Sequence, residues 1–197
     1  MSFLLGVDEA GRGPLAGPVA VGAILVPEGF DVELEFPGVR DSKKLTEKKR
    51  EELFVLLERR VEQGDMRFAV EYEDASVIDE AGIVTAVQRA LDRVVGKLAP
   101  DPANVLIKLD GSLRAPAVYA QETIIHGDAL VPIISLASVA AKVTRDRLML
   151  ELAKDFPEYG FDAHKGYGTK AHYEALAEHG LCAVHRRSFT HIAAENE

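Results

Sequence analysis

The sequence predicts an α/β protein in which a mixed sheet is flanked by helices. Two apolar runs near the N-terminus are joined by a glycine-rich turn, which indicates paired strands. Helical and strand patterns alternate further along the chain, as is typical of layered α/β folds. The chain has 197 residues and is 47% hydrophobic, so it can bury one sizeable core. We therefore expect a single domain.

The N-terminal third predicts two strands and one helix. The apolar run Leu4–Val7 is typical of a central strand covered on both faces. Val19–Val26 predicts a second strand, and the short turn before it favours antiparallel pairing. Gly29–Gly38 is expected to be a loop. Thr46 is a good N-cap for a helix whose apolar residues share one face, and Gly64 supplies its stop.

The middle of the chain alternates between strands and helices. Met66–Tyr72 predicts a third strand, and Ser76–Glu80 predicts a short helix. Apolar residues repeat at helical spacing from Val84 to Leu98, which predicts a longer helix. Val105–Leu109 and Val118–Ile125 are expected to form the fourth and fifth strands. The predicted sheet therefore has five strands.

The C-terminal part is predicted to be helical. Ile134–Asp155 forms one long helix in which three alanines, at positions 137, 140 and 141, allow close packing. Ser138, Lys142, Arg145 and Asp146 share the other side of this helix. A glycine-punctuated segment, 164–169, precedes a short helix at about 171–178.

Composition narrows the class of protein. The chain carries 32 acidic and 23 basic residues, and a net charge of −9 argues against a protein that coats nucleic acid non-specifically. The basic residues gather around 40–50, 142–147 and 165–187, which favours a basic groove on an acidic body. The single cysteine, Cys182, excludes an internal disulfide and a multi-cysteine zinc site. The sequence shows neither a cationic leader nor an apolar run that could span a membrane, so we expect a cytoplasmic protein.

Three of the predicted strands end in carboxylates. Asp8 and Glu9 follow the first strand, Asp110 follows the fourth, and Asp128 follows the fifth. Neighbouring strand residues point to opposite faces, so Asp8 and Glu9 can share a ligand only where the strand ends or bulges. If the four acids converge, their repulsion favours divalent cations, and oxygen ligands favour Mg²⁺ or Mn²⁺. Two such ions about 4 Å apart are a recurring device for attack at a phosphodiester.

Six sequence blocks together resemble bacterial ribonuclease HII, the type 2 ribonuclease H family. They occur in the family's order and extend over nearly the whole chain, so their combination is far more specific than any one block. The blocks are residues 8–13 (DEAGRG), 41–45 (DSKKL), 109–111 (LDG), 127–128 (GD), 137–146 (ASVAAKVTRD) and 164–169 (HKGYGT).

The resemblance implies a ribonuclease H-like fold with a catalytic core at about 1–155 and a substrate-contacting C-terminal helical segment at about 156–197. It implies endonucleolytic cleavage of RNA/DNA hybrids and of duplex DNA containing ribonucleotides, leaving 3′-hydroxyl and 5′-phosphate ends by two-metal catalysis. The family's catalytic and metal-binding carboxylates map onto Asp8, Glu9, Asp110 and Asp128. Asp146 lies in a conspicuous block, but by the same matching it is a helix-face partner of Lys142 or Arg145. We expect a monomer without an obligate protein partner.

The same matching assigns substrate contacts. Gly11, Arg12 and Gly13 match the element that recognises the 2′-hydroxyl at an RNA–DNA junction through backbone groups, and this hydroxyl distinguishes RNA from DNA. Tyr167 matches a residue that stacks on the sugar following the ribonucleotide. Three further residues match positions that approach backbone phosphates, namely Lys43, Ser138 and Lys142.

Two other interpretations stay open at this stage. A binding module of the same fold without catalysis predicts salt-sensitive binding and no cleavage. A structure-selective DNA nuclease predicts cleavage of an all-DNA junction. The complete carboxylate set argues against the binding module, because buried acids that repel one another reduce stability and would serve no purpose in a protein without catalysis.

Overall fold

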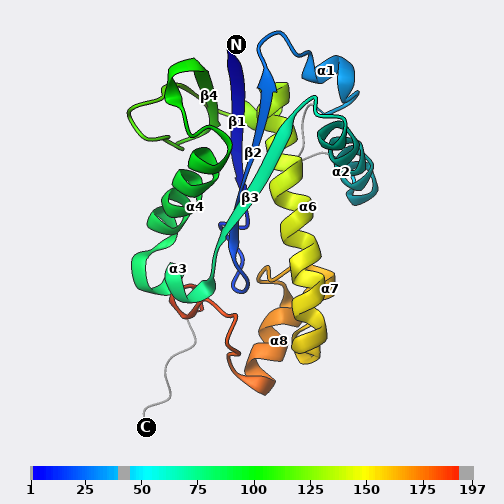
Figure 1. Cartoon of the computed structure of the whole chain (residues 1–197). Helices are drawn as coiled ribbons and strands as arrows, with labels where there is room; N and C mark the ends of the chain where they lie inside the picture. The colour runs from blue at the N-terminus through cyan, green and yellow to red at the C-terminus, as the bar shows by residue number, and fades with distance from the viewer. Residues whose placement is uncertain (1, 40–44, 191–197) are drawn as a thin grey trace.

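Five strands form one sheet in the order β3–β2–β1–β4–β5 (Figure 1). The structure is a computed structural model that describes residues 2–39 and 45–190. β2 is antiparallel to β1 and to β3, whereas β1, β4 and β5 run parallel. The predicted mixed five-stranded sheet is therefore confirmed. The strands are β1 (Phe3–Ala10), β2 (Val19–Pro27), β3 (Arg67–Glu73), β4 (Val105–Asp110) and β5 (Ala120–Ile124).

Helices cover both faces of the sheet (Figure 1). α3 (Ala75–Ala81) and α4 (Ile83–Leu98) pack on one face, where their apolar residues meet those of β1 and β2. α1 (Val32–Glu35), α2 (Glu47–Glu62) and α6 (Pro132–Asp155) pack on the other face. The remaining helices are α5 (Gly127–Leu130), α7 (Phe161–His164) and α8 (Lys170–His179), with short 3₁₀ turns η2 (Pro102–Asn104), η3 (Pro157–Tyr159) and η4 (Arg187–Phe189).

One expectation about local structure is wrong. The segment predicted as a loop at 29–38 contains the single-turn helix α1, because the Asp31 side chain accepts hydrogen bonds from the backbone of Glu33 and Leu34 at 3.1 Å each. Such side-chain capping starts a helix even where the apolar pattern is too short to predict one.

α6 lies directly on the backbone of the central strands. A Cβ atom added to Gly22 in β2 would lie 2.6 Å from the Ala137 carbonyl oxygen, and one added to Gly6 in β1 would lie 2.6 Å from that of Ile133. Glycine in the strands and alanine in the helix thus allow the close packing predicted from the sequence. The approach brings Ser138 and Lys142 of α6 to the pocket at the carboxyl end of β1.

The segment after α6 is bonded to the turn between β1 and β2. The Leu15 amide donates to the Gly166 carbonyl, the Gly17 amide to Val184, and the Arg186 amide to Leu15, each at 2.8 Å. A small apolar cluster that includes Leu15 accompanies these bonds. The C-terminal segment therefore fixes the shape of the glycine-rich turn. Within the described ranges, the helices are too short or too polar to cross a membrane.

Candidate active site

The carboxyl ends of three parallel strands meet at one rim of the sheet. β1 carries Asp8 and Glu9 there, β4 ends at Asp110, and the chain after β5 supplies Asp128 from α5. The Asp128 amide donates to the Asp110 carboxylate at 3.2 Å, and the charge of Asp110 acts on both Asp8 and Glu9. Acids distant in the sequence are brought together because parallel strands end on the same side.

β1 neither bulges nor ends at the two neighbouring acids. It stays paired in regular register with β2 through Ala10, whereas its pairing with β4 stops at Val7 and Leu109. The expectation of a bulge or strand end is correct only on the β4 side. There, the end of the parallel ladder leaves room beside Asp8 and Glu9 for Asp110.

Burial and mutual repulsion perturb the acids. Burial raises the pKa of Asp8 well above its ordinary value, and the charges of Glu9 and Asp110 raise it further, against a hydrogen bond from Ser138. Burial also raises the pKa of Glu9, while Arg12 lowers it, since the Arg12 guanidinium lies 3.2 Å from Glu9 Oε1. Among residues 2–39 and 45–190, Glu9 Oε2 is buried without a hydrogen-bond partner. Such a group is stabilised by an added cation.

The donor set fits a hard divalent cation. All four candidate ligands are carboxylates, and oxygen donors suit Mg²⁺ or Mn²⁺ better than zinc. In the part of the chain that the structure describes, no three histidine, cysteine or acidic side chains are already arranged to hold a metal ion. Arg12 is a cation that already lies on this rim, where it pairs with Glu9.

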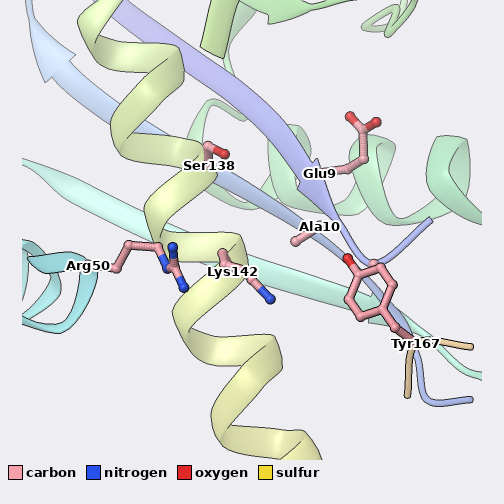
Figure 2. A pocket seen from close by; sticks show the side chains of 7 residues that line it. Glu9, Ala10, Arg50, Ser138, Lys142 and Tyr167 are labelled. Carbon is pink, nitrogen blue, oxygen red and sulfur yellow. The ribbon is translucent and has the colours of Figure 1, made fainter. Parts of the chain in front are cut away.

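A pocket of about 270 Å³ opens beside the acidic rim. Figure 2 shows Ser138 and Lys142 projecting from α6, Tyr167 opposite them, and Arg50 reaching in from α2. The Lys142 ammonium lies 5.7 Å from the centre of the Tyr167 ring and 2.7 Å from Asp146 Oδ1. The interpretation of Asp146 as a helix-face partner of Lys142 is thereby confirmed. The other residues that line the pocket are Glu9, Ala10 and Gly11.

Two arginines lie beneath the glycine turn instead of in an open basic groove. Arg145 and Arg186 are both fully buried. Arg186 donates to the carbonyls of Gly11, Arg12 and Gly17 at 2.7–2.9 Å. Arg145 donates to the carbonyl of Pro18 at 2.9 Å. The sequence-based assignment of these two side chains to a basic surface is therefore wrong.

Gly11 is required by this arrangement. Its φ of 87° lies in the left-handed region, and an added Cβ would lie 2.0 Å from Arg145 Nε. The guanidinium thus packs against the backbone of the turn, and a side chain at position 11 would displace it.

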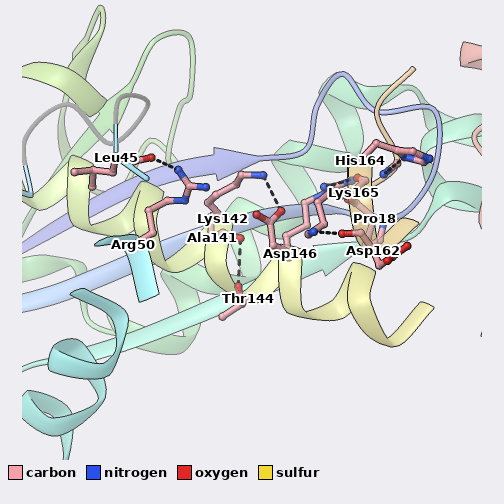
Figure 3. A network of polar contacts seen from close by, with 12 residues as sticks. Pro18, Leu45, Arg50, Ala141, Lys142, Thr144, Asp146, Asp162, His164 and Lys165 are labelled. Carbon is pink, nitrogen blue, oxygen red and sulfur yellow. Dashed lines mark hydrogen bonds and ion pairs between the residues drawn. The ribbon is translucent and has the colours of Figure 1, made fainter. Parts of the chain in front are cut away.

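The other predicted substrate residues are placed as follows. Arg12 and Gly13 lie at the accessible tip of the turn, and Tyr167 is 42% exposed. Ser138 contacts Asp8, so its hydroxyl faces the acids. Lys43 lies outside the described residues. The sequence placed Arg50 only within a group of cations, although it lines the pocket and donates to the Leu45 carbonyl at 2.5 Å (Figure 3).

The fold and the acidic rim define the class: this is an enzyme of the ribonuclease H type. The family model for ribonuclease HII matches residues 5–192, and the chain belongs to the ribonuclease HII family. Ribonuclease HII of Endomicrobium trichonymphae is 45% identical over 95% of this chain and 85% of its own length. That of Geotalea uraniireducens is 46% identical over 94% of this chain and 82% of its own length.

Solved structures agree on the fold. The ribonuclease HII in a PCNA complex from Archaeoglobus fulgidus superposes with a TM-score of 0.76 at 23% identity, over 95% of each chain. Ribonuclease H2 from Pyrococcus horikoshii gives 0.73 at 28% identity, over 94% of this chain and 93% of its own. A ribonuclease HIII in complex with Mn²⁺ gives 0.64 at 17% identity, over 91% and 63%.

Family membership fixes the general activity. The chain is a ribonuclease H that cleaves the RNA strand of RNA/DNA hybrids and depends on divalent metal ions.

Proposed function

We propose that the enzyme also cleaves at ribonucleotides embedded in duplex DNA and leaves 3′-hydroxyl and 5′-phosphate ends. The observation that supports this proposal most is the acidic rim beside the glycine turn. Asp8, Glu9 and Asp110 lie toward the carboxyl ends of β1 and β4, Asp128 follows β5 in α5, and the turn of Gly11–Gly13 continues directly from β1. The proposed metal ligand Glu9 and the first proposed recognition residue, Gly11, are therefore only two residues apart in the chain.

The four carboxylates would hold Mg²⁺ or Mn²⁺. A pair of these cations supplies activation of the attacking water and stabilisation of the departing 3′-oxygen. Glu9 would leave Arg12 to become a ligand, and its unpartnered Oε2 supports that role. Ser138 keeps Asp8 oriented through a hydrogen bond. Lys142, at the pocket wall, provides a point charge for a backbone phosphate.

The turn would recognise the ribonucleotide. Arg186 and Arg145 hold the carbonyls of Gly11, Arg12 and Pro18 inward, so the backbone at 11–13 is fixed before substrate binds. Preorganised backbone groups can exchange hydrogen bonds with a 2′-hydroxyl at little entropic cost. Tyr167, across the pocket, would stack on the next sugar.

We propose that residues 1–197 act as one domain, with 1–155 as the catalytic core and 156–197 as the segment that contacts substrate. The bonds from residues 166, 184 and 186 to the glycine turn support this division of roles. Action as a monomer and a cytoplasmic location stay predictions.

A cleavage assay tests the proposal. A labelled DNA duplex containing one ribonucleotide is incubated with the enzyme and Mg²⁺ or Mn²⁺, with and without chelator. We expect a single metal-dependent cut whose 3′ end a polymerase can extend and whose 5′ end a ligase can join. Asp110→Asn should abolish cleavage while the protein stays folded, as a cooperative thermal unfolding transition would show.

Asp92→Asn is a matched control, because Asp92 is exposed on α4 away from the rim. Cleavage by Asp110→Asn at the wild-type rate would contradict the assigned carboxylate set. Cutting of an all-DNA junction at the same rate would instead favour a structure-selective DNA nuclease.

A further inference from the structure

Two histidines outside the acidic rim form a buried contact beneath the pocket. His172 of α8 is fully buried, and His185 is 3% exposed. Their Nε2 atoms lie 3.0 Å apart, and neither residue was singled out by its sequence pattern. Burying a polar imidazole reduces stability unless its nitrogens are hydrogen-bonded. The partners of these two rings therefore show what the pair does.

The backbone at each end fixes where the protons lie. His172 Nδ1 is 2.9 Å from the Tyr167 carbonyl oxygen, which can only accept, so Nδ1 carries a proton. The Cys182 amide donates to His185 Nδ1 at 3.0 Å, so that nitrogen is unprotonated. The proton between the rings then belongs to His185 Nε2 and is donated to His172. Both imidazoles are neutral, and all four nitrogens are used.

The hydrogen bonds that run from His185 through His172 end at Tyr167, which lines the pocket. Tyr167 has its amide bonded to the His164 carbonyl at 2.9 Å, and its own carbonyl also accepts from the Thr169 amide at 2.8 Å. The preceding amide, that of Gly166, donates to His164 Nδ1 at 3.2 Å. The peptide group after Tyr167 is therefore held by the His172 ring and the one before Gly166 by the His164 ring, while the Tyr167 side chain stays accessible.

We propose that His172 is a positioning residue for Tyr167. By fixing the carbonyl of residue 167, and being itself fixed by His185, it sets the direction in which the Tyr167 ring stands over the pocket. This inference rests on the proposed contact between Tyr167 and the substrate sugar. It assigns His172 and His185 a role in substrate affinity at the RNA–DNA junction, although neither side chain lines the pocket.

Two conservative variants separate the two bonds of His172. An asparagine amide occupies the place of Nδ1, so His172→Asn retains the donor to Tyr167 and loses the contact with His185. A glutamine amide occupies the place of Nε2, so His172→Gln does the reverse. We expect His172→Gln to raise KM for a duplex with one ribonucleotide by about three- to tenfold, the effect of one lost hydrogen bond, with kcat unchanged. His172→Asn should have a smaller effect, a rise in KM of at most about twofold, because it loses only the support that His185 gives to residue 172.

The effect must pass through Tyr167. In a Tyr167→Ala background, His172→Gln should cause no further rise in KM. His179→Gln, on the same helix but partly exposed, is the control and should leave KM unchanged. The chain has no tryptophan, so Tyr167→Trp adds a single reporter. His172→Gln should increase its quenching by acrylamide in the absence of nucleic acid and metal.

The outcomes that overturn the proposal are distinct from those that overturn the proposed function. An equal rise in KM with and without Tyr167, or equal effects of the asparagine and glutamine variants, refutes positioning through Tyr167. An unchanged KM in Tyr167→Ala also refutes it, while cleavage at the ribonucleotide by wild type leaves the proposed function intact. Failure of the wild type to cleave that duplex refutes the function itself, and unchanged tryptophan quenching would then refute the positioning role independently.

Discussion

Lowering the pH should weaken the fold through His185. Burial, together with a smaller effect of the neighbouring His172, lowers the pKa of this imidazole from 6.5 to about 4. In the unfolded chain the imidazole has its ordinary pKa, so the unfolded state binds the proton more tightly. The contribution to stability is therefore complete above about pH 6.5 and is lost as the pH falls toward about 4.

The size of the effect follows from the two pKa values. They differ by about 2.5, and each pKa unit corresponds to about 1.4 kcal/mol, so the total loss approaches about 3 kcal/mol. At pH 4.5 about 2.5 kcal/mol of this has been lost. A typical domain has a free energy of unfolding of about 5–15 kcal/mol, so the change is measurable. The pKa of His172 is also lowered by burial, which adds in the same direction.

Urea unfolding followed by circular dichroism measures this loss at pH 7.5, 6.5, 5.5 and 4.5. The comparison is between wild type and His185→Gln, because the difference between their curves cancels the titration of the groups that His185 does not contact. His179→Gln serves as the exposed-histidine control. The reasoning is refuted if the two curves run parallel between pH 6.5 and 4.5, or if NMR shows His185 titrating near its ordinary pKa in the folded protein.

Three further predictions concern the turn, the acidic rim and the C-terminal segment. Gly11→Ala should destabilise the protein by about 3 kcal/mol in urea, through left-handed strain and the clash with Arg145, whereas Gly13→Ala, whose added Cβ meets nothing within 4 Å, should have little effect. Asp8→Asn should stabilise the metal-free protein by about 1 kcal/mol, because it removes a buried charge that Glu9 and Asp110 repel. The same change removes a proposed metal ligand, so adding Mg²⁺ should no longer raise the melting temperature. Asp79→Ala should cost about 1–2 kcal/mol of unfolding free energy, because its carboxylate accepts from the Ser188 hydroxyl and from the backbone amides of residues 187 and 188.

The sheet and the positions of its acids could be predicted because they depend on local patterns. An apolar run followed by a carboxylate and a glycine recurs at Asp8 and Asp110, and an apolar run before Gly127 leads to Asp128. Parallel strands then bring such ends to one rim without further information. The regular register of β1 with β2 past Glu9 could not be predicted, since strand pairing is set by the partner strand as much as by the chain itself.

The burial of Arg145 and Arg186 could not be predicted for a different reason. An arginine in a helix pattern or a loop is ordinarily exposed, and burying it requires carbonyl acceptors supplied by another part of the chain. Arg186 finds them 174 and 175 residues earlier, at Arg12 and Gly11. No local pattern reports a contact across that separation. The same holds for His172 and His185, whose partners are backbone groups of different loops.

Because of these distant contacts, the N-terminal turn and the C-terminal segment shape the pocket together. The glycine turn contains the first of the proposed recognition residues, and its carbonyls are held by Arg186 and Arg145 and its amides by residues 166 and 184. Tyr167, on the opposite side of the pocket, is bonded within that same C-terminal segment. A carboxylate set on the sheet alone could hold metal ions, but it would lack a fixed surface to distinguish a ribose from a deoxyribose. If the turn and Tyr167 recognise the ribonucleotide as proposed, selectivity for RNA depends on the C-terminal segment as much as on the strand that carries the acids.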